Sequence, residues 1–128
     1  TEAAGGSVPS GAAVLFNTVI EDNTGGGIVY NPVTGQFTIN QPGTYFVTWS
    51  LATDGAGPAT QIVFDLQLGG TSVAESATPA LTGLLTGAAL VNVAAVPAVL
   101  QLVNTTGSAV FIADTEVQGN IVIYRVGA

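Results

Sequence analysis

The chain has 128 residues, of which 48% are hydrophobic and 7% charged, and its formal net charge is −7, with Arg125 as the only cation and no lysine, histidine or cysteine. Phosphate backbones and anionic lipid surfaces are bound by clusters of Lys and Arg, so nucleic-acid binding and membrane-surface binding are excluded. The missing residue types also exclude Ser–His and Cys–His nucleophiles, His/Cys zinc sites and the P-loop.

From the N-terminus, residues 1–12 are small, polar and Gly-rich, which predicts a flexible arm or linker before one domain at 13–128. Within that domain, apolar and polar residues alternate with a period of two, and no segment shows a helical stripe. The expected strands are 13–20, 28–31, 36–40, 43–51, 61–68, 71–75, 86–94, 98–104, 109–113 and 120–126. Short strands separated by Gly and Pro turns indicate a jelly-roll β-sandwich.

The strand at 43–51 gives the clearest expectation about the core. Tyr45, Val47 and Trp49 alternate with Thr44 and Thr48, so they face one way and fill the space between two sheets. The last strand, 120–126, is apolar on both faces, which is typical of a strand in the interior or at an interface.

Residues 16–49 also carry a recognisable pattern of aromatics and glycine. The spacing of Phe16, Asp22, Tyr30 and Phe37, followed by the run 43–49, resembles the globular-head signature of complement C1q. Departures are a longer gap between Asp22 and Tyr30, a valine at 47 where an aromatic is usual, and Trp49 in place of Phe or Tyr. The segment 121–126 looks like the closing strand of that family. The signature residues are Phe16, Tyr30, Phe37, Gly43, Tyr45, Trp49 and Tyr124.

This resemblance implies the ten-stranded jelly roll of two antiparallel sheets that C1q shares with tumour necrosis factor, assembled as a compact homotrimer. The lysine-free, Ala/Val/Thr/Gly-rich composition is most similar to the C-terminal domains of bacterial collagen-like exosporium glycoproteins. It implies an extracellular, spore-surface structural head that registers an N-terminal collagen-like stalk. The alternative is a recognition module that binds proteins or glycans through intersubunit grooves and the loops 21–27, 54–59 and 78–88. A third hypothesis is an amyloid-like coat protein that assembles through the segments 88–96 and 120–126.

Composition alone also favours self-association. Ordinary globular proteins have roughly 25% charged residues, so a chain with so few has little to cover a monomer's surface. Membrane insertion is the competing explanation, but the longest apolar segment, 88–100, is interrupted by Asn92 and Pro97 and falls short of the roughly 18 residues of a spanning helix.

The acidic residues leave two chemical options open. A pair of carboxylates is the minimal requirement for glycoside hydrolysis, yet solvated surface acids are the commoner case and we expect no enzyme. Calcium takes oxygen ligands, which makes Asp22, Asp114 and Glu116 candidate ligands, although no EF-hand loop is present and no cofactor is required.

Two other polar residues stand out. Arg125 lies in an apolar strand, so it should either pair with Asp65, Asp114 or Glu116 or reach solvent from a sheet edge. Asn104-Thr105-Thr106 matches an N-glycosylation acceptor, an accidental match in a bacterial protein.

Overall fold

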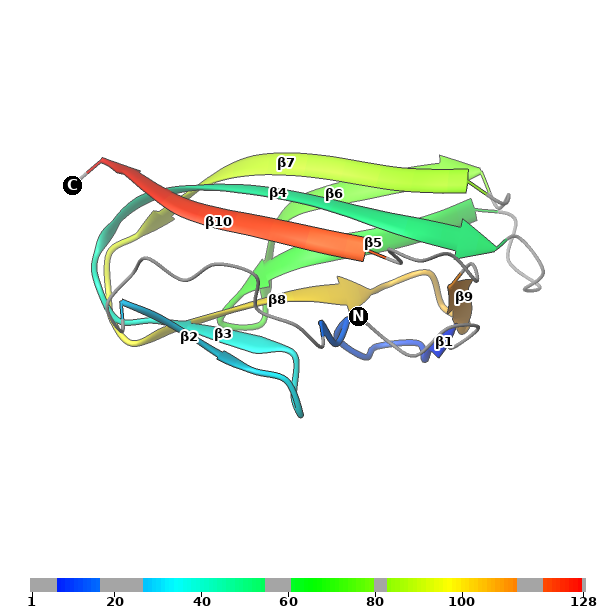
Figure 1. Cartoon of the computed structure of the whole chain (residues 1–128), viewed down its shortest axis with the longest axis horizontal. Helices are drawn as coiled ribbons and strands as arrows, with labels where there is room; N and C mark the ends of the chain where they lie inside the picture. The colour runs from blue at the N-terminus through cyan, green and yellow to red at the C-terminus, as the bar shows by residue number, and fades with distance from the viewer. Residues whose placement is uncertain (1–6, 17–26, 55–60, 80–82, 113–118, 128) are drawn as a thin grey trace.

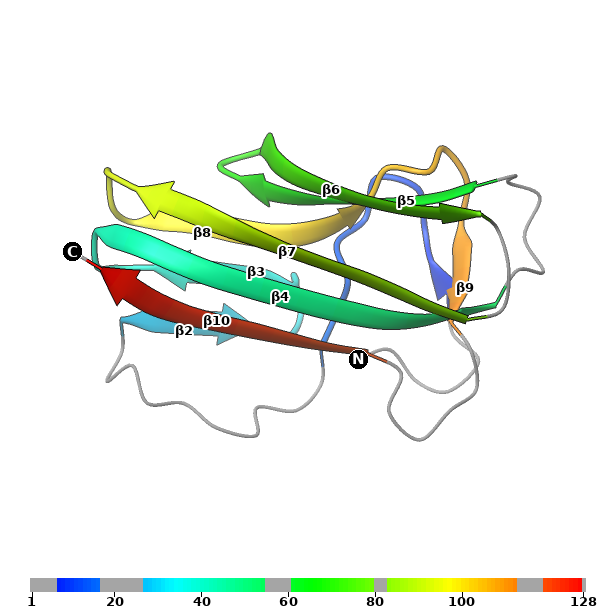
Figure 2. The same cartoon turned by 90° about the horizontal axis from the view of Figure 1, so that it is seen from above.

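The computed structural model describes residues 7–16, 27–54, 61–79, 83–112 and 119–127, and within them the protein is a sandwich of two antiparallel sheets. In sheet A, β4 is bonded to β7 along one edge and to β10 and then β9 along the other, and β9 is bonded in turn to β1. Sheet B has the order β2-β3-β8-β5-β6. Figure 1 shows β7, β4 and β10 of sheet A side by side, with β8, β3 and β2 of sheet B below them, and Figure 2 shows the sandwich from above. The expected all-β jelly-roll architecture is confirmed.

The strands follow the expected order with some changes at their ends. Their bounds are β1 Ser7–Val8, β2 Ile28–Asn31, β3 Gln36–Ile39, β4 Gly43–Asp54, β5 Gln61–Leu68, β6 Thr71–Pro79, β7 Gly83–Val93, β8 Ala98–Asn104, β9 Val110–Ile112 and β10 Gly119–Gly127. The prediction of a strand at 13–20 is wrong for residues 14–16, and Ala13 makes only an isolated bridge to Val103. Residues 17–20 lie outside the described part of the chain.

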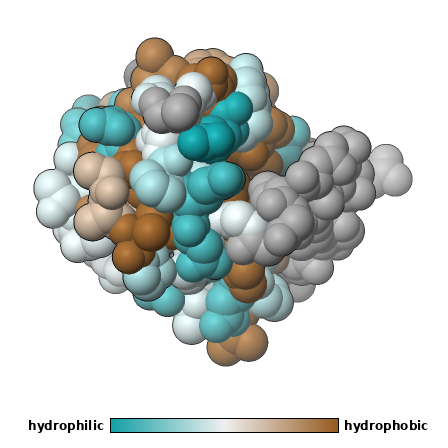
Figure 3. Space-filling model, turned by 90° about the vertical axis from the view of Figure 1, so that its left-hand side faces the viewer, coloured by the Kyte–Doolittle hydropathy of each residue, from teal (hydrophilic) through white to brown (hydrophobic). Residues whose placement is uncertain are grey.

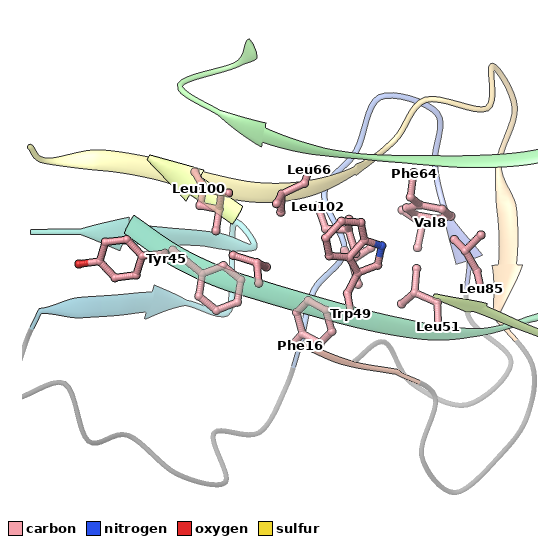
Figure 4. Close-up of a cluster of buried hydrophobic side chains, with 14 of the residues drawn as sticks. Val8, Phe16, Tyr45, Trp49, Leu51, Phe64, Leu66, Leu85, Leu100 and Leu102 are labelled. Carbon is pink, nitrogen blue, oxygen red and sulfur yellow. The ribbon is translucent and has the colours of Figure 1, made fainter. Parts of the chain in front are cut away.

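The core lies between the sheets and is formed by alternate residues of each strand. In β4, Tyr45, Val47, Trp49 and Leu51 are all buried, while the residues between them are only half-buried. From sheet B, leucines and Phe64 approach the same interior, as the labelled side chains in Figure 4 show. Period-two alternation therefore produces the core that the sequence predicts.

Trp49 joins the two sheets through a contact that requires glycine. Its partner in the β4–β7 ladder is Gly87, and a Cβ at that position would overlap the indole ring. The indole Nε1–H donates to Ser76 Oγ on β6 of sheet B at 3.0 Å, and Ser76 is buried. Gly87 thus lets a large side chain lie flat across its neighbouring strand, and Ser76 satisfies its only polar atom.

The N-terminal segment is packed into the domain, so the arm predicted at 1–12 is wrong for residues 7–12. Val8 is buried in the core and β1 pairs with β9. Further on, the rings of Phe16, Tyr30 and Phe37 pack together. The rings of Tyr30 and Phe37 are stacked, with their centroids 4.3 Å apart. The phenol oxygen of Tyr30 accepts the Phe16 N–H at 2.6 Å, and burial raises the pKa of Tyr30.

Asn104 fixes the same N-terminal segment from the other side. Its side chain is fully buried, and Nδ2 donates to the carbonyls of Val8 and Ser108 at 2.9 Å and, at 3.4 Å, of Pro9. Its Oδ1 accepts the N–H of Thr106 at 2.9 Å. Every polar atom of the side chain is therefore occupied inside the domain, so the apparent glycosylation acceptor is a structural residue.

The start of β4 and the end of β10 meet around Gly43. This glycine has a positive φ of 153°, and a Cβ there would lie 2.5 Å from Arg125 Nε and 2.6 Å from the carbonyl oxygen of Gly127. Arg125 is exposed and donates from Nε to the Pro42 carbonyl at 3.1 Å. Pairing of Arg125 with Asp65 is not found: Asp65 lies in sheet B. Asp114 and Glu116 lie outside the described residues.

Candidate functional site

The candidate site is the outer face of sheet A, which we call the sheet A face. Because Tyr45, Val47, Trp49 and Leu51 point into the core, the residues between them in β4 point away from it, and the ladders of β7 and β10 continue the same parity. The sheet A face is formed by Thr44, Phe46, Thr48, Ser50, Ala52, Leu84, Thr86, Ala88, Leu90, Asn92, Asn120, Val122 and Tyr124.

Large apolar side chains on this face are open to solvent in the single chain. Leu90 is 67% exposed, Leu84 is 64% exposed, and Val122 and Tyr124 are each 50% exposed. Contiguous apolar patches of this kind are uncommon on monomeric soluble proteins and mark interaction surfaces.

Cross-strand pairs arrange the sheet A face in rows. One row consists of Leu90, Phe46 and Tyr124, with the Phe46 and Tyr124 rings edge to face at 5.5 Å. Farther along β4, Ser50 Oγ donates to Asn120 Oδ1 at 3.1 Å. Polar and apolar rows therefore alternate on the face: Asn92 lies opposite Thr44 before the aromatic row, and Leu84 lies opposite Ala52 beyond Ser50.

Between Thr44 and Ala52 of β4, and along the residues of β7 and β10 that pair with this stretch, the sheet A face holds no Asp, Glu, Lys or Arg. Burying it would therefore leave no ion without a partner, and hydroxyl and amide groups can find hydrogen bonds with a second copy. The end of the molecule where β4 begins and β10 ends, on the left in Figure 1, has a more polar surface. Figure 3 shows a hydrophilic band there between hydrophobic patches.

Tyr124 is a signature residue that does not lie in the core. Strand β10 places Ile121 and Ile123 toward the core and Tyr124 on the sheet A face. The strand is apolar on both sides because one side packs inward and the other forms the exposed patch. Phe16, Phe37, Tyr45 and Trp49 are buried.

The calcium candidates Asp22, Asp114 and Glu116 fall outside the described residues. Within the described residues, no three acidic side chains gather where they could hold a metal ion. The described part of the chain also contains no helix long and apolar enough to cross a membrane.

The recognition loops are only partly open to description. Residues 21–26 and 55–59 are outside the described part of the chain. The expected loop at 78–88 is wrong over most of its length, because β6 runs to Pro79 and β7 begins at Gly83.

Comparison with known proteins agrees with this architecture. The family model of the C1q domain matches residues 3–124. Among solved structures, Eiger TNF from S. frugiperda gives a TM-score of 0.66 at 14% identity, over 97% of this chain and 89% of that one. Rabbit GITRL gives 0.50 at 14% identity, over 80% of each chain. No curated protein sequence matches the chain.

Proposed function

The chain belongs to the C1q domain family, and from this premise we propose that it is a non-enzymatic head domain that assembles as a homotrimer through the sheet A face. Domains of the C1q and TNF-like group are typically trimeric and generally lack enzymatic activity. The sequence has no His, Cys or Lys from which a Ser–His, Cys–His or Schiff-base nucleophile could be built, which agrees with a structural role.

The observation that carries the proposal is the exposed, uncharged sheet A face. Removing apolar surface from water contributes about 25 cal/mol per Å², so an interface that covers Leu84, Leu90 and the exposed residues of β10 stabilises the assembly. A closed threefold ring hides such a face on every copy. A second copy is the favoured occupant because the face carries no charge to match a charged partner.

We further propose that the trimer displays and registers a collagen-like stalk on a bacterial spore surface, the exosporium. The support is compositional: the chain has no lysine and is rich in Ala, Val, Thr and Gly, as in the bacterial collagen-like glycoproteins that it resembles. A head that holds three chains together would bring three stalk ends into one register.

Trimer formation is tested by native mass measurement of Leu90→Lys beside the unchanged chain. The unchanged chain is expected to be trimeric at micromolar concentration. Three buried ammonium groups without partners should shift the variant toward monomer. Leu90 is 67% exposed in the single chain, so its own fold should survive, which far-UV circular dichroism checks.

The matched control is Val33→Lys, which adds the same charge at an apolar residue that is 81% exposed outside sheet A, and it should remain trimeric. The proposal would be contradicted if the unchanged chain were wholly monomeric at micromolar concentration. It would also be contradicted if Leu90→Lys and Val33→Lys dissociated equally.

A further inference from the structure

Two carboxyl groups face each other on sheet B, far from the sheet A face. Asp65 on β5 and Glu75 on β6 are directly opposite in the antiparallel ladder, and Asp65 is only 7% exposed. Side chains at such opposed positions lie within contact distance. Their neighbours along β5, Phe64 and Leu66, point into the core, so the pair lies on the outer side of sheet B.

Neither carboxyl has a cationic partner in the described part of the chain. The one cation of the sequence, Arg125, belongs to sheet A and donates to the Pro42 carbonyl. On the other side of β5, Asp65 pairs with Val103 of β8. Strands β5, β6, β7 and β8 hold no ionisable side chain besides Asp65 and Glu75.

The two groups can bond to each other only when one of them carries a proton, because two carboxylates offer acceptors alone. Asp65 Oδ1 is buried without a hydrogen-bond partner, and the Glu75 side chain opposite it is exposed. With both groups ionised, two negative charges would stand side by side with no donor between them, and one buried oxygen would still be unsatisfied. The geometry therefore favours one shared proton.

We propose that Asp65 and Glu75 form a proton-sharing pair that joins β5 to β6 in acid and weakens sheet B when the proton leaves. The hydrogen bond and the charge of Asp65 both raise the pKa of Glu75 above 4.5. A carboxyl with a raised pKa in the folded state contributes stability that is complete below its unfolded pKa, near 4.5, and is lost as pH rises through the folded value. The Asp65–Glu75 pair affects the stability of the folded chain, and this proposal does not rest on the proposed trimer.

The test is the melting temperature between pH 3.5 and 8, in the presence of EDTA, for the unchanged chain and for Glu75→Gln. The glutamine keeps an N–H donor for Asp65 at every pH. The unchanged chain should melt at lower temperature as pH rises from 4 to 8, and Glu75→Gln should lose most of this decline.

Glu2→Gln is the control for charge alone. It removes the same formal charge, so it should retain the decline of the unchanged chain. The proposal is overturned if the unchanged chain and Glu75→Gln show parallel pH profiles, or if Glu2→Gln flattens the profile equally. Asp65→Asn should also flatten it; if that variant does not fold, the pair Glu75→Gln and Glu2→Gln still decides.

Discussion

At the scale of the residue, Asn104 shows how one buried amide can organise a chain terminus. It reaches the carbonyls of Val8 and Ser108 with its two N–H groups and receives the Thr106 N–H on its oxygen. Its backbone continues the link, since the Asn104 N–H donates to the Ala12 carbonyl at 2.9 Å. The segment that enters the domain is thus fixed to the end of β8 by side chain and backbone together.

Asn104→Asp should destabilise the domain by about 3 kcal/mol, because a carboxylate oxygen replaces the donor that faces buried carbonyls. The measurement is the free energy of unfolding from urea titration at one protein concentration. Thr105→Ala is the control: its side chain is exposed and its backbone bond to Val63 remains, so a change within about 0.5 kcal/mol is expected. Similar losses in the two variants would contradict this account of Asn104.

At the scale of the element, the pairing of β4 with β7 depends on the fit of Trp49 over Gly87. The indole occupies the space where a Cβ at residue 87 would lie, and its N–H reaches Ser76 in the other sheet. A displaced indole would lose that hydrogen bond and disturb the packing between the sheets. The fit thus links strand pairing within sheet A to contact with sheet B.

Gly87→Ala should therefore cost about 1–3 kcal/mol, the usual range for overpacking a filled core. The indole is the only tryptophan, so its fluorescence reports the displacement directly while urea titration gives the loss of stability. Gly127→Ala adds the same methyl group in β10, where nothing lies within 4 Å of the new Cβ. This variant should change neither the tryptophan fluorescence nor the free energy of unfolding. A Gly87→Ala variant as stable as Gly127→Ala would disprove the packing argument.

Sequence alternation predicts most strands but not how they pair. It locates β3, β5 and β8 well because each buries one face against the core. It misses β1, whose two residues are too short for any period, and the end of β6, where small and polar residues give no pattern. It also misses the start of β7, because Leu84 and Leu85 are adjacent apolar residues and do not alternate. Gly87 resembles a turn residue until the ladder places it opposite Trp49.

The candidate site is harder to predict for a related reason. Leu84 and Leu85 are equally apolar, yet Leu85 is buried and Leu84 is 64% exposed. The apolar residues on both faces of 120–126 were the one sequence signal for an interface. Only the register of β4 with β7 and β10 shows that Leu90, Phe46 and Tyr124 form one row.

At the scale of the whole molecule, the surface area of the single chain is ordinary, but its number of charged residues is unusually small. The single chain exposes 6473 Å², close to the roughly 6,200 Å² expected for a monomer of this mass. Folding alone thus leaves a normal surface, but only 7% of the residues are charged. The proposed assembly through the sheet A face would reconcile the two, because it would place the exposed rows of β7 and β10 inside an assembly.

A head that associates in this way should also drive the folding of a fibre attached to it. We expect Gly-Pro-Pro repeats fused before Thr1 to form a triple helix that melts higher than the free peptide and independently of protein concentration. The reason is that three tethered chains meet at an effective concentration on the order of millimolar. Circular dichroism of the triple helix, recorded over a dilution series, measures both properties. Leu90→Lys should return the fused repeats to the concentration-dependent melting of the free peptide, whereas Val33→Lys should not. If the repeats melt alike with and without the head while the head itself is trimeric, then trimer formation stands and its role in registering a stalk does not.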